Sequence, residues 1–434
     1  MVNEKFRYKN WQEVEEKAKS LGIKFPYAEN VSALNKPLPL HSKILHNRFV
    51  VQPIEGCDAL ADGSPSEMTL RRYDRFASSG AGMLWMEATA AHPDYRSSNG
   101  QLYITEENVD AFARMVESIR SRYEREHGYE PVLILQITHS GRYRKVNNIP
   151  APVIAQHNPY MERTAPLSNE HIVTDDELMQ IEEQFGKAAI WVKKAGFDGM
   201  DIKCAHYYLG SELLSAYDRE GNYGGSFENR TRFLMNCMQA AKPAVDENFF
   251  LTCRLNGYDG LPYPYGFGVT RERGLEPDYT ETSKIISRLH EEAGVNLVNI
   301  TLGNPYFNPF VNRPYDTGPV EPAEHPFIGV ARMLEGAKKM KEMNPNVITV
   351  ASGLSYMREF SGNIAAGAVA AGDFELAGFG RLALACPQFM KKMTNGTLTR
   401  RECCVTCTNC SNLMRKFRPA GCIVHDSEQY RLVY

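Results

Sequence analysis

The cysteines near the C-terminus form the sharpest chemical pattern in the sequence. Cys404, Cys407, Cys410 and Cys422 follow the spacing C-x2-C-x2-C-x11-C. Three thiolates on one tight loop with a distant fourth are typical of a cuboidal [4Fe–4S] cluster, whereas structural zinc more often takes two C-x2-C pairs. The spacing therefore favours iron–sulfur over zinc, and incidental thiols rank last. The adjacent Cys403 could replace Cys404 in a shifted register.

Glycines and cations form a second pattern, at the ends of apolar runs. Gly353, Gly380 and Arg381 follow the last two runs, where glycine lets backbone N–H groups approach phosphate oxygens and arginine binds them bidentately. Gln136 offers a donor and an acceptor to an imide edge, and Arg254 places positive charge beside a ring that becomes anionic on reduction. Taken singly, each of these residues could belong to a tight turn or an ion pair. Together they predict a binding site for a phosphorylated ring with redox chemistry.

Lys203, His206 and Tyr208 follow the fourth apolar run. His206 and Tyr208 can each donate a hydrogen bond, and tyrosine can give up a proton when a carbanion forms. Most single His or Tyr residues are core residues, and the strand-end position is what favours catalysis here. Lys203 is either a buried cation near the ring or the partner of a carboxylate such as Asp201, and the sequence leaves both open.

The elements that must position these residues are eight apolar runs with seven amphipathic segments between them. The predicted strands are 48–53, 82–87, 132–137, 199–203, 249–255, 296–301, 347–351 and 374–379. The predicted helices are 66–79, 106–127, 174–195, 226–244, 280–293, 324–343 and 355–371. Eight such units without a Gly-rich dinucleotide turn after the first strand favour an α/β (β/α)8 TIM barrel over a doubly wound sheet.

Three segments fall outside the repeat. We expect 1–396 to form the barrel, with 1–47 as an N-terminal cover and 397–434 as a cysteine-rich extension. Residues 139–173 form a long loop that could be a lid or wall of the site.

Composition excludes several classes of protein. The chain has 434 residues, of which 43% are hydrophobic and 23% charged, with a net charge of −3. This balance excludes a disordered or coiled-coil chain and argues against nucleic acid as the main partner. A run of eighteen apolar residues and an apolar leader are both missing, so a cytoplasmic protein without membrane partners is expected.

Three motifs carry a resemblance to a known family. They are Asn47-Arg48 with Pro53, the segment LQITHSGR at 135–142 and the segment YGGSFENR at 223–230. With the cysteine spacing, they make the chain resemble the old yellow enzyme superfamily of flavin oxidoreductases from Asn47 to His425. The iron–sulfur branch with bacterial 2,4-dienoyl-CoA reductase and trimethylamine dehydrogenase is the most similar.

The resemblance implies FMN bound in the barrel. Pro53 and Ala88 would contact the isoalloxazine, Gln136 and Arg254 its pyrimidine edge. Gly353, Gly380 and Arg381 would hold the phosphate. His206 would polarise a substrate carbonyl and Tyr208 would deliver a proton. Cys404, Cys407, Cys410 and Cys422 would ligate a [4Fe–4S] cluster.

The chain departs from this family at three points. Lys203 stands where a histidine is frequent, and Glu55 stands near the flavin where Thr or Cys is frequent. A carboxylate there would disfavour an anionic reduced flavin unless it is paired, so we expect Glu55 and Lys203 to form a charge pair. We also expect the protein to lack the FAD and NAD(P)H domain of the dienoyl reductases.

The resemblance implies an FMN-dependent ene-reductase acting on the C=C bond of an enone or enoyl thioester, with hydride from flavin N5 and a proton from Tyr208. Electrons would come through the cluster from a separate flavoprotein or ferredoxin, or directly from NAD(P)H. One alternative is an amine dehydrogenase with an aromatic box from Tyr207, Tyr208, Tyr306 and Phe307. The other is a non-catalytic barrel with structural zinc. The substrate and the formation of a homo-oligomer are left open.

Overall fold

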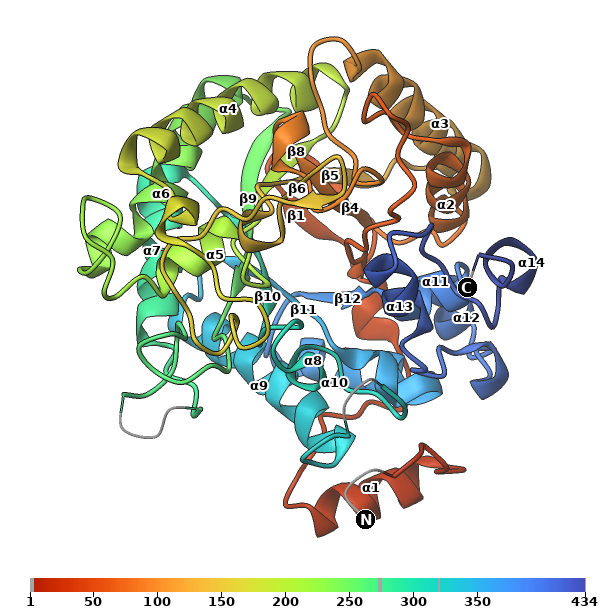
Figure 1. Ribbon diagram of the computed structural model, residues 1–434. Helices are drawn as coiled ribbons and strands as arrows, with labels where there is room; N and C mark the ends of the chain where they lie inside the picture. Colours follow the sequence, from red (N-terminus) through yellow and green to blue (C-terminus); the bar gives the residue numbers. More distant parts are fainter. Residues whose placement is uncertain (1–3, 272–274, 319–320, 434) are drawn as a thin grey trace.

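Eight parallel strands close into a barrel at the centre of the computed structural model, which describes residues 4–271, 275–318 and 321–433 (Figure 1). In barrel order the strands are β3 (Phe49–Val51), β4 (Met83–Ala90), β5 (Val132–Thr138), β8 (Gly199–Ile202), β9 (Phe250–Asn256), β10 (Leu297–Thr301), β11 (Ile348–Ala351) and β12 (Leu376–Phe379). The last strand pairs with the first, Gly378 opposite Val50, so the sheet has no edge. The predicted (β/α)8 barrel is confirmed.

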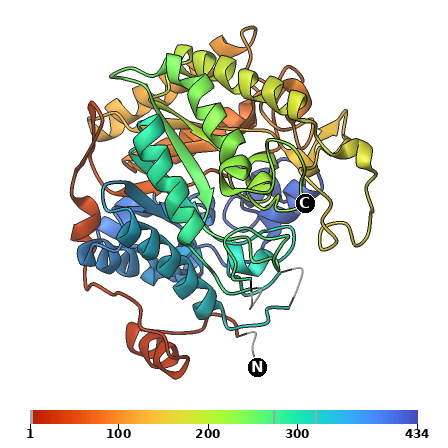
Figure 2. The ribbon, with the colours of Figure 1, turned by 90° about the vertical axis from the view of Figure 1, so that its left-hand side faces the viewer.

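Helices form the outer ring (Figures 1 and 2). They are α2 (Glu67–Ala77), α3 (Val109–His127), α4 (Asp175–Lys194), α6 (Phe227–Ala241), α7 (Thr280–Ala293), α9 (Pro326–Met343) and α10 (Ser361–Ala371). Thr174 caps α4 and exchanges hydrogen bonds with Glu177, as the sequence predicts. The predicted helix 355–371 divides instead, because a 3₁₀ segment at Leu354–Phe360 precedes α10.

A hairpin closes the amino-terminal end of the barrel. Strands β1 (Leu38–Leu40) and β2 (Lys43–Leu45) pair antiparallel. Leu40 and Leu45 pack against Met83, Phe250 and the other apolar residues at the strand starts. The carboxyl-terminal end is thereby left as the open mouth where barrel enzymes place their sites.

The segment after the barrel helices lies against α2 and the first barrel loop. It contains α12 (Phe389–Thr394), α13 (Asn409–Arg415) and α14 (Ser427–Tyr430). Arg71 of α2 makes two hydrogen bonds of 2.8 Å with the Asp426 carboxylate, and the Ala420 N–H donates to the Gly56 carbonyl at 2.7 Å. The division of the chain after residue 396 stays a prediction. Among the described helices, none is both long and apolar enough to cross a bilayer.

Candidate functional site

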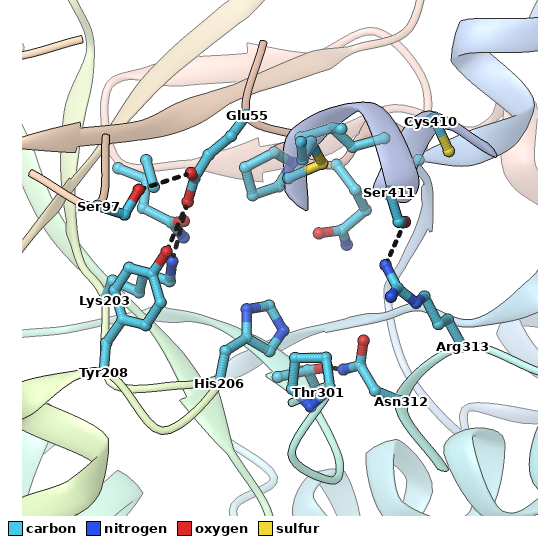
Figure 3. Close-up of a pocket in the computed structure, with 18 of the residues that line it drawn as sticks. Glu55, Ser97, Lys203, His206, Tyr208, Thr301, Asn312, Arg313, Cys410 and Ser411 are labelled. Carbon is cyan, nitrogen blue, oxygen red and sulfur yellow. Dashed lines mark hydrogen bonds and ion pairs between the residues drawn. The ribbon is translucent and has the colours of Figure 1, made fainter. Parts of the chain in front are cut away.

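A cavity of about 350 Å³ opens at the carboxyl ends of the strands, a size typical of small-molecule sites (Figure 3). Every predicted catalytic and cofactor residue lines it: Pro53, Glu55, Ala88, Gln136, Lys203, His206, Tyr208, Arg254, Gly353, Gly380 and Arg381. The barrel geometry thus brings together side chains that lie more than three hundred residues apart in the sequence.

Asp201 organises the floor of this cavity. Its buried carboxylate accepts hydrogen bonds from Trp85 Nε1 at 2.7 Å, Gln136 Nε2 at 2.6 Å and the Arg254 backbone N–H at 2.6 Å. Burial raises the pKa of Asp201 to about 6, against the lowering effect of these donors. Asp201 therefore fixes the orientation of the Gln136 amide, a role that the sequence did not indicate.

Several buried nitrogens on the cavity wall have no partner in the described part of the chain. They are Arg254 Nε, Arg381 Nη1, Arg313 Nε and His206 Nε2. Burial lowers the pKa of Arg254 to about 10, so it keeps its charge at neutral pH. An unsatisfied buried donor costs about 1–3 kcal/mol, so these atoms fit a ligand with acceptor and anionic groups, as FMN has.

Glu55, Lys203 and Tyr208 form one cluster at the side of the cavity (Figure 3). Lys203 Nζ lies 3.6 Å from Glu55 Oε1, so the predicted charge pair is confirmed. The Tyr208 hydroxyl donates to the same oxygen at 3.0 Å, and Lys203 Nζ lies 3.4 Å from the centre of the Tyr208 ring. Lys203 makes no ion pair with Asp201, whose carboxylate oxygens accept the hydrogen bonds at the cavity floor.

The charge states of this cluster follow from burial. Burial lowers the pKa of Lys203 to about 8, opposed by Glu55. Burial and the neighbouring Glu55 raise the pKa of Tyr208 well above its usual value. Burial, Arg254 and Lys203 hold the pKa of His206 far below its usual value. At neutral pH, Tyr208 is therefore a neutral donor, His206 a neutral imidazole and Lys203 an ammonium.

A strained turn after β8 aims His206 into the cavity. His206 and Tyr207 have φ values of 63° and 59°, in the left-handed backbone region that residues other than glycine rarely adopt. The turn sends the Tyr207 hydroxyl away from the cavity, where it donates to the Tyr265 carbonyl at 2.8 Å. Strained residues of this kind cluster at functional sites.

Aromatic side chains cover part of the cavity wall. Tyr143 stacks on Tyr306 with ring centres 3.7 Å apart, and the hydroxyls of Tyr306 and Tyr208 lie 3.4 Å apart. Of the four residues predicted for an aromatic box, Tyr208 and Tyr306 line the cavity. Tyr207 and Phe307 do not: Phe307 packs against Tyr160 instead. That part of the prediction is wrong because adjacent residues in these turns point to different sides.

The cysteines line a second, smaller cavity beside the first. Cys404, Cys407, Cys410 and Cys422 all face it, together with Arg381. Two sulfurs accept backbone hydrogen bonds of 3.4 Å, Cys404 from Thr406 N and Cys422 from His425 N. Cys410 and Arg381 line both cavities, so the two sites share a wall.

The structure also bears on the choice between Cys403 and Cys404. The Cys403 thiol donates to the Thr399 carbonyl at 3.4 Å, and Cys403 is not among the residues of the second cavity. Within the described ranges, no three His, Cys, Asp or Glu side chains gather as the ligands of one metal ion do. The cysteines surround a cavity without converging on one point.

A buried charge network behind Glu55 was missed by sequence reasoning. Arg72 pairs with Asp58 and Glu87, at 2.5 and 2.7 Å, and all three side chains are nearly inaccessible. Glu87 also accepts from the Gly56 backbone N–H at 2.6 Å. The network fixes the loop that carries Glu55. The available signal was Arg72, a charged residue that stands in a predicted helix directly before Tyr73, which is buried together with Phe76.

The closed barrel and its donor-rich mouth fit a family of flavin oxidoreductases. The chain belongs to the NADH:flavin oxidoreductase / NADH oxidase family, whose model matches residues 33–399. The resemblance read from the sequence motifs is confirmed by this match.

Individual relatives differ in name. An NADH oxidase of Thermoanaerobacter brockii is 27% identical over 84% of this chain and 51% of its own. The structure of 2-naphthoyl-CoA reductase has a TM-score of 0.72 at 20% identity, over 91% of this chain and 57% of its own. Histamine dehydrogenase from Rhizobium sp. 4-9 has a TM-score of 0.69 at 19% identity, over 90% and 52%. The chain thus spans about half the length of this curated relative.

Proposed function

We propose that this protein is an FMN-dependent ene-reductase that reduces the C=C bond of an α,β-unsaturated carbonyl compound. The observation that carries the proposal is the arrangement of Tyr208 and His206 in one cavity. A neutral tyrosine hydroxyl and an unpartnered imidazole nitrogen face the same space. This is the pair of groups that such a reduction needs, one to donate a proton and one to bind the carbonyl oxygen.

FMN fits the donor set of the cavity. Gln136 and Arg254 would hold the pyrimidine edge, Pro53 and Ala88 would contact the ring, and the Gly353–Gly380–Arg381 group would hold the phosphate. The unpartnered Arg254 Nε and Arg381 Nη1 support this assignment, because both would gain anionic or carbonyl partners. When bound, FMN supplies the hydride that adds to the β-carbon of the alkene.

The protein's own residues would then manage the charge that develops on the substrate. His206, protonated at Nε2, would donate to the carbonyl oxygen and stabilise the enolate. Tyr208 would pass its proton to the α-carbon. A tyrosinate beside Glu55 would be repelled, and the Lys203 ammonium over the ring offsets that repulsion. Glu55 and Lys203 are thus proposed as a neutral pair that keeps Tyr208 usable as an acid.

A [4Fe–4S] cluster is proposed on Cys404, Cys407, Cys410 and Cys422. Their shared cavity and the N–H···S hydrogen bonds support it. A single zinc would hold four sulfurs about 2.3 Å from one centre, whereas a cuboidal cluster spreads them more widely. When bound, the cluster would supply electrons one at a time. They would reach the flavin through the wall shared at Cys410, from a reduced flavoprotein or ferredoxin, or NAD(P)H would reduce the flavin directly.

The cysteine assignment is tested by iron and acid-labile sulfide content. Cys404→Ala should lose the cluster absorption near 400 nm, and the matched Cys403→Ala should retain it. Equal iron in both variants would remove Cys404 from the ligand set. Zinc in place of iron would make the loop structural.

Amine oxidation is the second candidate. The fold similarity to histamine dehydrogenase and the stacked Tyr143 and Tyr306 favour it. Against it, the Tyr208 face that a substrate ammonium would use already holds Lys203 Nζ. A second cation there would be repelled, so ene-reduction is the better fit.

The proposal is tested by product analysis with the purified holoenzyme. We expect cinnamaldehyde with dithionite or NADPH to give 3-phenylpropanal, and Tyr208→Phe to give far less. Tyr306→Phe is the matched control because it removes the neighbouring hydroxyl. Oxidation of histamine without reduction of the alkene would replace the proposal by the second candidate.

A further inference from the structure

The flavin cavity holds far more positive than negative charge. Its described lining contains six cationic side chains and a single carboxylate, that of Glu55. The cations are Lys145, Lys203, Arg254, Arg313, Arg381 and Arg415. Three have an assignment: Lys203 pairs with Glu55, Arg254 lies near Asp201, and Arg381 is proposed for the flavin phosphate. The other three call for an explanation.

Lys145, Arg313 and Arg415 have no ion pair in the described ranges. Arg313 donates from Nη1 to Ser411 Oγ, and its Nε has no partner. Lys145 Nζ donates only to carbonyls, those of Ser97 at 3.0 Å and Tyr143 at 3.4 Å. Arg313 and Lys145 are half-buried, whereas Arg415 is exposed. Gathering like charges without a counter-ion is unfavourable, most of all where they are partly buried. The arrangement therefore fits an anion that arrives with a ligand.

The three cations come from three segments that line the cavity: Arg313 follows α8 (Pro309–Asn312), and the other two segments meet at the cavity mouth. Lys145 belongs to β6 (Lys145–Val146), and Arg415 ends α13. The segments are in contact, because Lys145 Nζ lies 4.8 Å from the centre of the Phe417 ring. Arg313 lies across the cavity from Glu55, Lys203 and Tyr208 (Figure 3). Arg313 is thus remote from the proposed reacting groups. Lys145 lies nearer to them, because it donates to the Ser97 carbonyl and the Ser97 hydroxyl lies 3.5 Å from Glu55 Oε2.

Neither proposed cofactor accounts for all of this charge. The FMN phosphate is assigned to Arg381 and the glycines of the last two loops. The cysteine cavity is lined by Arg381 but not by Lys145, Arg313 or Arg415. Arg313 also interacts electrostatically with Cys410, so the proposed cluster would offset part of its charge. A ligand in the flavin cavity is the remaining source of negative charge for the three cations together.

We propose that Lys145, Arg313 and Arg415 form a subsite for an anionic group, carboxylate or phosphate, carried by the substrate. The substrate class is then an unsaturated carbonyl compound with an anionic group remote from its alkene. This inference rests on the proposed ene-reduction for the reacting end of the molecule. It also gives α13 two tasks, because the same helix carries Cys410 and Arg415.

Binding to the oxidised holoenzyme tests the inference without any turnover. The probes are cinnamaldehyde, 4-carboxycinnamaldehyde and the phosphate ester of 4-hydroxycinnamaldehyde, titrated by calorimetry. We expect either anionic probe to bind at least about tenfold more tightly than the neutral one, with the advantage falling at high salt. The tighter of the two anionic probes identifies the group. Equal dissociation constants for all three would overturn the subsite.

Variants locate the effect. Arg415→Gln and Lys145→Gln should each weaken binding of the anionic probes about fivefold to tenfold and leave the neutral probe unchanged. Arg418→Gln is the control, because Arg418 is exposed, donates to the Val433 carbonyl and does not line the cavity. It should bind all probes as the unmodified protein does. A loss of affinity for all three probes alike would contradict the subsite.

The outcomes separate the two proposals. Tight binding of an anionic probe without its reduction would remove the ene-reductase and keep the subsite. Efficient reduction with no preference for anionic probes would do the reverse. If Arg415→Gln raised only the KM for NADPH, the cations would serve the donor, and the substrate assignment would be wrong.

Discussion

The two walls of the flavin cavity differ in whether their charged side chains are paired. On the wall built after β3 and β8, Glu55, Lys203 and Tyr208 satisfy one another at 3.0–3.6 Å. On the wall built by the loop after β10 and by α13, Arg313 and Arg415 have no carboxylate within ion-pair distance in the described chain. The paired wall is complete and therefore suited to chemistry with defined protonation states. The unpaired wall lacks a counter-charge and is therefore suited to binding.

The largest expected effect is on the paired wall, at Tyr208. Tyr208→Phe should slow reoxidation of the reduced flavin by cinnamaldehyde by about 10²–10⁴-fold, because the proton donor is lost. Reduction of the flavin by its donor should be unchanged. Both rates are measured separately in a stopped-flow instrument. Full alkene reduction in this variant would assign the proton to another group, with Tyr306 the nearest hydroxyl.

Lys203→Met should break the pairing itself. The Glu55 carboxylate would then repel the developing tyrosinate, and we expect alkene reduction to slow by about 10–100-fold. Flavin reduction should slow far less. Equal slowing of both half-reactions would show that Lys203 acts on the flavin and not on the substrate side.

The pH dependence of alkene reduction tests the Glu55–Lys203 pair without any substitution. Because the pKa of Lys203 lies at about 8, raising the pH through this value removes its proton and leaves Glu55 uncompensated. The rate of alkene reduction should therefore fall as pH rises above about 8. Lys203→Met should lack this decrease, and a profile that persists in the variant would assign the ionisation elsewhere.

On the cavity floor, Asp201→Asn should weaken FMN binding by about tenfold. An asparagine cannot accept from Trp85, Gln136 and the Arg254 backbone as a carboxylate does, so the Gln136 amide would lose its fixed orientation. Flavin fluorescence on dilution measures the dissociation constant. An unchanged constant would mean that the Gln136 orientation is set by the flavin.

The smallest expected effect is on stability and has opposite signs on the two walls. Arg313→Met removes an unpaired buried cation and should raise the free energy of unfolding of the substrate-free protein by about 1 kcal/mol. Lys203→Met leaves a carboxylate unpaired and should lower it by about 1–3 kcal/mol. Thermal unfolding gives both values. The same sign for both variants would break the comparison between the walls.

The sequence predicted the parts of the site that follow from regular structure. Gln136, Arg254 and Arg381 end strands whose apolar runs are plain, and closing a parallel barrel places all strand ends at one mouth. The cysteine spacing predicted one shared site for four thiols, and the four cysteines line one cavity, because three of them share one loop.

The site residues that the sequence did not predict are placed by the path of the long loops back to the barrel mouth. Lys145 and Arg415 belong to segments whose sequences show no regular apolar periodicity, and Phe417, two residues after Arg415, contacts Lys145. The partner of Lys203 was also open, because Asp201 and Glu55 were both plausible until the floor was seen to use Asp201. Tyr207 shows the converse error, since a residue next to two predicted site residues points away.

The most direct test of the central claim compares the two half-reactions in one stopped-flow experiment. Reduced holoenzyme is mixed with cinnamaldehyde, and oxidised holoenzyme is mixed with histamine, both without oxygen. The account predicts rapid flavin reoxidation with one equivalent of 3-phenylpropanal, and no reduction by the amine. Flavin that stays reduced with the alkene but is reduced by histamine would contradict it.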